Sequence, residues 1–384
     1  MNNPKPDRFA LVYVTGYDGA TAKQAWSDEA KCRTALAGVQ DAHFNVFLAD
    51  VTALSFKGTA ADKVAFLNDF ELTFMVNLAE ILRDANDQPT EAVMGTVVDY
   101  ASAGVWGFML HPEISSNAVP LTHRLGQLSQ SIRKVVATPL LVGYQASAYQ
   151  VVNQNLYKNF FVVTSYRSSD VNLSDERPML LLQMLLCSSR NYCAYRMFWP
   201  NSKDKPQVLL GEGALALAYG AKGLIWGGDH PVDGYRPANA WLKAIGDLLF
   251  ECRWPVVLSS DGTCQSEAQS MGTFPGITMV VPGGGVMTAS YFSGGDLPAN
   301  SRYLLLVYRG PDSHVQLTMD VKEDGKALTA CKYLFDEGRF DDNTTVHTKT
   351  DRYSETRKCH EGSVELLKLQ YTNTEAIAAV RERR

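Results

Sequence analysis

The feature that most constrains the fold is a regular alternation, over roughly the first two thirds of the chain, of short apolar runs with longer amphipathic ones. Buried parallel strands read as unbroken hydrophobic stretches because helices cover both faces of their sheet. Eight runs fit this description: Phe9–Thr15, Asn45–Asp50, Val93–Asp99, Val105–Leu110, Leu140–Tyr144, Phe160–Thr164, Ala194–Phe198 and Gly223–Trp226. Eight strand–helix units in ~250 residues predict a closed (β/α)8 TIM barrel, an α/β fold, with a doubly wound open sheet as the alternative.

Helical patterns separate most of these runs. They cover Lys23–Ala37, Ala61–Ala85, Leu121–Val136, Pro178–Ser189, Gln207–Tyr219 and Trp241–Phe250. The link from Asp99 to Val105 is too short for a helix, so it indicates either a degenerate crossover or an error in one strand assignment. No GxGxxG follows a strand, which disfavours a nucleotide-binding open sheet.

The pattern changes after Trp254, where helical periodicity stops and Gly, Pro and Ser separate short β-rich runs. These runs are Pro255–Leu258, Ile277–Val281, Val286–Phe292, Tyr303–Arg309, His314–Met319, Leu328–Phe335 and Val364–Gln370. Short strands at this spacing predict a smaller antiparallel β-sandwich. We therefore expect a barrel over residues 1–253 and a sandwich over 254–384, the latter without catalytic groups.

Charge and apolar content exclude several classes of protein. The chain of 384 residues has a net charge of −5, which argues against a nucleic-acid binder, because such proteins normally have a basic face. No apolar run approaches the ~20 residues that span a bilayer. The first residues, MNNPKPDRF, lack the apolar core of a signal peptide. This predicts a cytoplasmic protein, or one released without a classical signal, for example in a virion.

Cysteine and histidine spacing gives no metal signature. The seven cysteines are scattered without a CxxC pair, and the seven histidines without HExxH spacing. Reduced structural thiols, no metal and no cofactor are therefore expected. The sequence leaves the oligomeric state open.

In a barrel of this kind the active site lies at the C-terminal ends of the strands. Carboxylates follow several of the predicted strands, and aromatic residues follow most of the others. Sugar rings stack their C–H faces on aromatic rings and offer hydroxyls to carboxylates and amides. The pattern thus favours a carbohydrate site over a phosphate site, which would need Gly-rich loops and basic residues. The alternative is structural, because Asp often caps helices and rim Trp often only packs.

One segment, GVWGFMLHPEISSNAVPLTHRLGQLSQSIRK from Gly104 to Lys134, resembles the fourth βα unit of glycoside-hydrolase-like barrels related to clan A. The stretch Gly211–Gly228 resembles the seventh helix and eighth strand of such enzymes. The later SRYLLLVYRGPDSHVQLTMDV resembles the β-sandwich that often follows these barrels. The resemblance implies that Glu113 takes the place of the family's general acid/base.

Two departures from the family pattern bear on catalysis. The family reads Asn-Glu or Asp-Glu at strand four, where this chain has His111, Pro112 and Glu113. The family nucleophile is a glutamate ending strand seven, and AYRMFWP contains none. Either another carboxylate partners Glu113, with Asp229 first and Asp99 second, or retaining chemistry is lost. Glu113 has structural alternatives too: it could cap the helix near Leu121 or pair with Arg167 or with Arg196, if Arg196 points into the barrel.

The remaining strand-end residues are predicted to bind substrate. Aromatic stacking is expected from Trp199, Trp226, Tyr100 and Tyr166, and polar contacts from Arg167, Asp50, Gln145 and His230. Two functions follow from these residues. One is a glycoside hydrolase acting on an oligo- or polysaccharide. The other is a non-catalytic carbohydrate-binding or structural module, for example in a phage particle or surface assembly.

Overall fold

The computed structural model describes residues 7–15, 26–114, 118–145, 161–166, 194–198, 206–227, 232–253, 255–261, 276–320, 322–323, 326–336, 339–340, 345–346 and 352–373. By their contacts, Met1–Pro206 and Ala221–Lys243 form one compact unit. Gln207–Gly220 and Ala244–Arg384 form a second.

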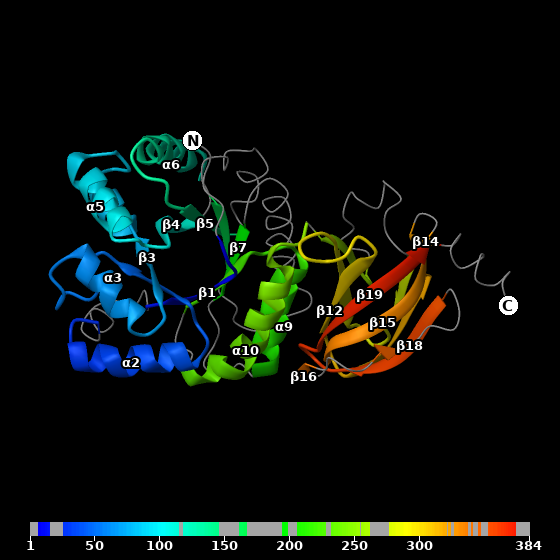
Figure 1. The fold of residues 1–384 in the computed structure, drawn as a ribbon. Helices are drawn as coiled ribbons and strands as arrows, with labels where there is room; N and C mark the ends of the chain where they lie inside the picture. The colour runs from blue at the N-terminus through cyan, green and yellow to red at the C-terminus, as the bar shows by residue number, and fades with distance from the viewer. Residues whose placement is uncertain are drawn as a thin grey trace. The chain divides into compact units, whose positions relative to one another are not determined.

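The first unit holds a closed barrel of eight strands in sequence order, each parallel to its neighbours (Figure 1). The strands are β1 (Ala10–Val14), β2 (Val46–Asp50), β3 (Thr73–Asn77), β4 (Gly107–Ile114), β5 (Leu140–Gln145), β6 (Phe161–Tyr166), β7 (Ala194–Phe198) and β8 (Gly223–Trp226). The predicted (β/α)8 barrel is confirmed, and the open sheet is excluded because β8 pairs with β1.

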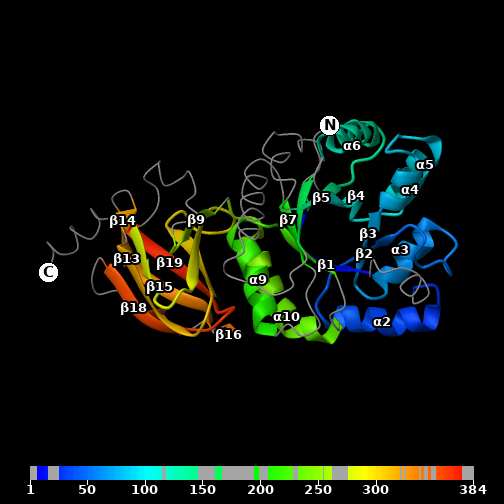
Figure 2. The same cartoon turned by 180° about the vertical axis from the view of Figure 1, so that it is seen from behind.

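Helices lie on the outside of the strands, as Figures 1 and 2 show for the first half of the barrel. In the first unit they are α2 (Glu29–Asp41), α3 (Ala60–Asn68), α4 (Ala79–Asp84), α5 (Glu91–Ser102) and α6 (Ala118–Arg133). The chain also forms α9 (Pro206–Ala218), nearly all of which belongs to the second unit, and α10 (Val232–Phe250), which contributes residues to both units. Local chemistry sets several starts, because a capping side chain satisfies an otherwise unpaired N–H of the first turn. Asp28 caps α2, and Thr59 forms a reciprocal capping box with Asp62 at α3.

The predicted third strand, Val93–Asp99, is wrong, because these residues belong to α5. Their β-branched composition suggested a strand. However, Thr90 caps the segment by accepting a hydrogen bond from the Val93 N–H. The buried residues Val93, Val97 and Tyr100 recur at helical spacing.

The predicted helix Ala61–Ala85 is also wrong in part, because it is interrupted by the true third strand. α3 ends at Asn68, β3 occupies Thr73–Asn77, and α4 follows directly. The chain leaves α3 through Glu71, whose φ of 57° is left-handed. Glycine usually takes this conformation after a helix, so its absence here hid the break.

Alternate residues of the strands fill the barrel interior. One buried cluster contains Val12, Leu48, Tyr195, Met197 and Ile225. Since side chains alternate across a strand, Arg196 and Trp226 point outward into the helix layer. The interpretation that Arg196 points into the barrel is therefore wrong.

The second unit contains two antiparallel sheets, which confirms the predicted sandwich class. One sheet has the order β10 (Gly276–Val280), β13 (Ser313–Asp320), β18 (Arg352–Cys359). The other has the order β14 (Lys322–Glu323), β15 (Lys326–Asp336), β19 (Val364–Asn373), β12 (Ser301–Arg309), β11 (Val286–Phe292), β9 (Val256–Ser259). The short β16 (Arg339–Phe340) and β17 (Thr345–Val346) pair with β15.

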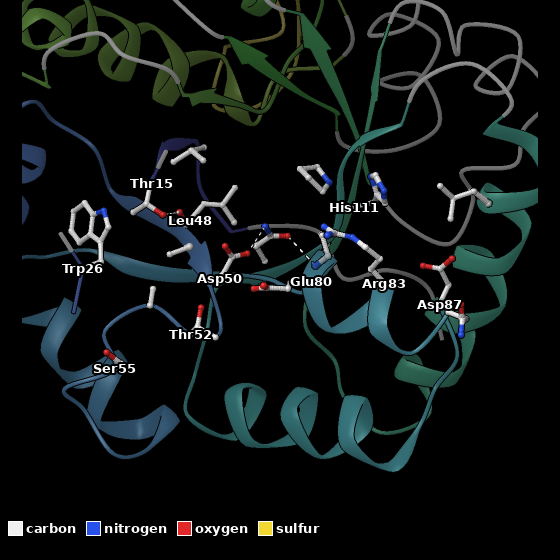
Figure 3. A pocket seen from close by; sticks show the side chains of 18 of the residues that line it. Thr15, Trp26, Leu48, Asp50, Thr52, Ser55, Glu80, Arg83, Asp87 and His111 are labelled. Atoms are coloured by element: carbon white, nitrogen blue, oxygen red, sulfur yellow. Dashed lines mark hydrogen bonds between the residues drawn. The ribbon is translucent and has the colours of Figure 1, made fainter. Parts of the chain in front are cut away.

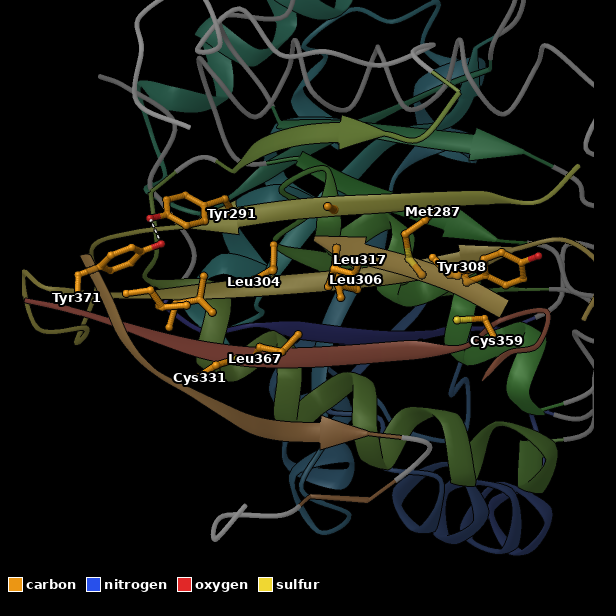
Figure 4. Close-up of a cluster of buried hydrophobic side chains, with 14 residues drawn as sticks. Met287, Tyr291, Leu304, Leu306, Tyr308, Leu317, Cys331, Cys359, Leu367 and Tyr371 are labelled. Carbon is orange, nitrogen blue, oxygen red and sulfur yellow. Dashed lines mark hydrogen bonds between the residues drawn. The ribbon is translucent and has the colours of Figure 1, made fainter. Parts of the chain in front are cut away.

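Both sheets contribute to the core of this unit (Figure 4). Alternate residues such as Leu304 and Leu306 of β12 and Leu317 of β13 belong to one buried cluster. Within it the Tyr291 hydroxyl donates a hydrogen bond to the Tyr371 hydroxyl at 3.1 Å. Within the described ranges, no helix combines the length and apolar character needed to cross a lipid bilayer.

Candidate functional site

A pocket of about 970 Å³ opens at the C-terminal ends of β1–β4 (Figure 3), and we call it the mouth pocket. It lies where barrels of this class carry their chemistry. Its polar lining includes Thr15, Asp50, Asn77, Glu80, Arg83, Asp87, His111 and Arg124. Trp26 contributes an aromatic wall and packs edge-on against Phe47 at 4.9 Å between ring centroids.

Asp50 ends β2 and is oriented by Asn77 at the end of β3. Asn77 is only 6 % exposed. Its Nδ2 donates to Asp50 Oδ1 at 2.7 Å, and its Oδ1 accepts the Ala79 N–H at 3.1 Å. One amide thus holds the start of α4 and the carboxylate at once. Because the amide nitrogen and the amide oxygen of Asn77 are both hydrogen-bonded, the Asn77 side chain is held in place and fixes the Asp50 carboxylate at the pocket wall.

Glu80 lies in the first turn of α4 and also lines the mouth pocket. Figure 3 shows the Asp50 and Glu80 carboxylates pointing into the same part of the pocket. Carboxylates accept hydrogen bonds only, so this side of the pocket suits a ligand that carries hydroxyl donors.

His111 of β4 faces the pocket with a hydrogen-bond donor. The Glu113 backbone N–H donates to His111 Nδ1 at 3.3 Å, so the neutral ring carries its proton on Nε2. Burial lowers the pKa of His111, although the nearby Asp87 and Glu113 carboxylates act in the opposite direction. The imidazole is therefore neutral near pH 7.

Two arginines of the lining differ in their partners. Arg124 of α6 donates to the Asp87 carboxylate at 3.1 Å, so these two charges offset each other. Asp87 and its neighbour Asn86 have left-handed φ angles of 58° and 51°, which Asp and Asn tolerate better than most residues. Arg83 of α4, within the described part of the chain, has no hydrogen bond or ion pair on its guanidinium.

The end of β4 is irregular, and this places Glu113 beside His111. The pairing of β4 with β5 shifts register between Met109 and His111 and again between His111 and Ile114. From residue 111 to 114, His111 and Glu113 are half-buried, whereas Pro112 and Ile114 are buried. The two half-buried side chains therefore share one side of the strand.

The predicted catalytic residues have different outcomes. Glu113 lies at the end of β4, as expected, next to the pocket-lining His111; its catalytic role stays a prediction. Asp99 does not follow a strand, because it is an exposed residue of α5. Its placement in the barrel mouth was wrong. Asp229 lies outside the described residues.

Among the predicted binding residues, Asp50 lines the mouth pocket, and Gln145 ends β5 half-buried without lining it. Trp226 is 0 % exposed and its ring lies 5.5 Å from that of Tyr235, so its placement on the stacking surface is corrected. Tyr166 ends β6, but its side chain is not among those that the structure describes. Trp199, Arg167 and His230 lie outside the described residues.

Tyr100 supports the pocket from α5 instead of lining it. Its hydroxyl donates to the Val51 carbonyl at 3.2 Å and accepts from Lys63 Nζ at 3.3 Å. Lys63 Nζ donates to the same carbonyl at 2.6 Å. Because Val51 follows Asp50, this buried network anchors the loop that leaves β2. The predicted placement of Tyr100 after a strand was wrong.

Sequence reasoning missed the pocket residues that follow β3, namely Asn77, Glu80 and Arg83. The signal was present in the run TFMVN, Thr73–Asn77, which is β-branched and aromatic and ends in a polar residue. Within the part of the chain that is described, no three His, Cys, Asp or Glu side chains are placed to hold a metal ion.

Comparison with known proteins places the fold. No family model matches the sequence, and no curated protein sequence is similar to it. The structure is similar to that of a GH27 β-L-arabinopyranosidase from Geobacillus stearothermophilus in complex with arabinose. The TM-score is 0.59 at 9 % identity, over 94 % of this chain and 97 % of that one.

Two further solved structures agree. A GH30 endoxylanase from Clostridium papyrosolvens matches with a TM-score of 0.50 at 8 % identity, over 96 % of this chain and 98 % of that one. An α-amylase from H. orenii matches with a TM-score of 0.50 at 10 % identity, over 94 % of this chain and 99 % of that one. The chain has the fold of these glycoside hydrolases. The resemblance inferred from the sequence is thus confirmed at the level of the fold.

Proposed function

We propose that this glycoside-hydrolase-like protein binds an oligo- or polysaccharide in the mouth pocket and hydrolyses a glycosidic bond there. The observation that supports this most is the pocket itself. It is about 970 Å³ in volume, and it lies at the C-terminal end of the barrel. That volume is within the usual range for small-ligand sites and accommodates sugar rings.

The lining matches the chemistry of a sugar. Asp50 and Glu80 supply acceptors for ring hydroxyls, and His111 supplies a donor. Trp26 offers an apolar surface for the C–H face of a ring. Because Asn77 fixes the Asp50 carboxylate, that acceptor is oriented before a ligand binds.

Hydrolysis needs a proton donor and a second carboxylate across the scissile bond. We assign Glu113 as the acid: its proton goes to the glycosidic oxygen as the C–O bond to the anomeric carbon breaks. In an inverting reaction, a second carboxylate takes a proton from the water whose oxygen forms the new C–O bond. Asp50 is the pocket residue proposed for this role, and Asp229 remains the partner predicted from the sequence.

The test is a Glu113→Gln variant of the full chain. Wild type is first assayed on a panel of β-L-arabinopyranosides, xylo-oligosaccharides and malto-oligosaccharides, chosen from the activities named for the similar structures. On any substrate cleaved, the variant should lose at least about 100-fold in rate, the typical contribution of general acid catalysis. Asp99→Asn makes the same chemical change on the exposed face of α5 and should leave the rate unchanged. Equal rates for wild type and Glu113→Gln would reject the assignment.

A second function, binding without cleavage, is favoured by one observation. His111 and Pro112 line the mouth pocket, whereas Glu113 does not. Calorimetry separates the two functions. A glycan of the panel that binds wild type but is not cleaved by it supports the binding module, and an absence of both binding and cleavage contradicts both.

A further inference from the structure

We propose that the glycan bound in the mouth pocket carries an acidic group, a carboxylate or a sulfate, and that Arg83 together with His111 holds it. This inference rests on the proposed function, because it names the class of carbohydrate that the same pocket would select. It concerns binding only, and it holds whether or not the glycan is then cleaved.

Arg83 carries a positive charge that has no partner in the described part of the protein. A guanidinium is always charged and presents five N–H donors with no acceptor. Arg83 lines the pocket, and within the described part of the chain its guanidinium has no hydrogen bond or ion pair. The other arginine of the lining, Arg124, is already paired with Asp87 at 3.1 Å. Arg83 is therefore the cation of the described lining that is available to a ligand.

The second step is the donor beside it. Arg83 and His111 are close enough that the guanidinium lowers the pKa of the imidazole, in the same direction as the larger effect of burial. The ring is thus neutral, and its Nδ1 is occupied by the Glu113 N–H, which leaves Nε2–H as a donor. Figure 3 shows Arg83 and His111 on the same side of the pocket. Asp87 also lines this side, but its carboxylate is paired with Arg124 at 3.1 Å.

The third step is the set of other carboxylates in the lining, because Asp50 and Glu80, the latter one helical turn before Arg83 in α4, contribute acceptors. These carboxylates repel an anionic group and attract hydroxyls, so they orient an acidic sugar with its acid toward Arg83. A neutral sugar would satisfy the acceptors but leave the guanidinium without an anionic partner. A uronic acid or a sulfated sugar satisfies the guanidinium and the acceptors at once, since either anion accepts charge-assisted hydrogen bonds from arginine.

The experiment compares matched pairs of ligands by calorimetry at low salt. Oligogalacturonides are measured against the same oligosaccharides after carboxyl reduction, and sulfated galactan oligosaccharides against their desulfated forms. Wild type should bind the acidic member of at least one pair about 10-fold to 100-fold more tightly, the range expected for hydrogen bonds between charged groups. The pair that shows the preference distinguishes a carboxylate from a sulfate.

Two variants locate the preference. Arg83→Gln should remove it by weakening binding of the acidic member more than that of the neutral member, and Arg83→Lys should retain part of it. Arg33→Gln removes a surface arginine of α2 that pairs with Glu29, and it should change nothing. A preference that survives Arg83→Gln overturns the assignment of Arg83.

The failures of the two proposals are distinguishable. If wild type binds neutral glycans as tightly as acidic ones, the acidic ligand is rejected while carbohydrate binding stands. If neither these pairs nor the neutral panel binds, the proposed function fails and this inference fails with it.

Discussion

At the scale of single residues, Lys63 is unusual because its amine is buried among neutral partners. It is 8 % exposed and donates to the Val51 carbonyl and the Tyr100 hydroxyl. No carboxylate of the described residues pairs with it. Burial lowers the pKa of Lys63 from its usual 10.5, since the charged amine loses its hydration.

This shift predicts a pH dependence of stability. Between the lowered pKa of the folded state and about 10.5, the unfolded chain binds more protons than the folded one. The free energy of unfolding should therefore rise with pH across this window, relative to a Lys63→Met variant that has no amine. Urea unfolding of both proteins from pH 7.5 to 10.5 measures the difference. Parallel curves would mean that the amine is hydrated in the folded protein.

Asn77 gives a second prediction at this scale. Asn77→Asp replaces the amide that donates to Asp50 Oδ1 at 2.7 Å with a second carboxylate. Loss of the hydrogen bond beside a charge should cost about 1–3 kcal/mol in the free energy of unfolding and weaken glycan binding. Asn68→Asp, an exposed change of the same charge near the end of α3, should cost less. Equal losses in the two variants would contradict the role given to Asn77.

Residues of the site could be predicted only where their strand was recognised. Asp50 and Glu113 follow apolar runs that are indeed β2 and β4, so both were placed at strand ends correctly. Asn77, Glu80 and Arg83 were missed because β3 was not recognised. Trp226 was misplaced for a different reason: the run GLIW fixes the strand but not which of Ile225 and Trp226 faces inward.

At the scale of elements, most strands of the barrel could be predicted, because a buried parallel strand is a continuous apolar run. The third could not. Neither glycine nor proline interrupts the chain from Thr59 to Gln88, so two helices and a strand read as one amphipathic segment. The neighbouring α5 contains three β-branched valines, and only its Thr90 cap and the spacing of its buried residues reveal the helix.

The bulged end of β4 gives a prediction at this scale. A Cβ on Gly143 of β5 would lie 1.7 Å from the Pro112 carbonyl oxygen, so the irregular strand needs a glycine opposite it. Gly143→Ala should destabilise the protein by at least about 1–3 kcal/mol, the cost of overpacking. It should also weaken glycan binding, because it displaces the backbone between His111 and Glu113.

The matched control is Gly38→Ala, which should change stability in the opposite direction. Gly38 lies inside α2, and a Cβ there meets no atom within 4 Å. Gly38→Ala should stabilise by about 0.5–1 kcal/mol through helix propensity. Thermal unfolding compares the two, and a Gly143→Ala protein as stable as wild type would show that β4 relaxes freely.

At the scale of the whole molecule, the sequence pattern and the contacts divide the chain differently. The sequence pattern changes near Arg253. The pattern locates the last barrel strand and the first antiparallel one. Contacts instead group Gln207–Gly220, which contains α9, with the antiparallel sheets. In an amphipathic helix, the apolar face shows which side packs against the rest of the protein. α9 has no such single face, because it is buried from Leu209 to Ala218 except for the half-buried Glu212. Its sequence therefore does not reveal which elements cover it.

The grouping predicts that the sandwich depends on α9. Gly362, in the turn between β18 and β19, has a left-handed φ of 79°, and a Cβ on Gly211 of α9 would lie 2.5 Å from its Cα. A fragment of residues 254–384 lacks this helix and should unfold without the cooperativity of the full chain. In the full chain, Gly211→Ala should destabilise by about 1–3 kcal/mol despite its better helix propensity, because the added methyl meets backbone. Denaturant titration of both proteins checks this. A fragment that unfolds cooperatively, together with a Gly211→Ala protein more stable than wild type, would show that α9 is dispensable to the sandwich.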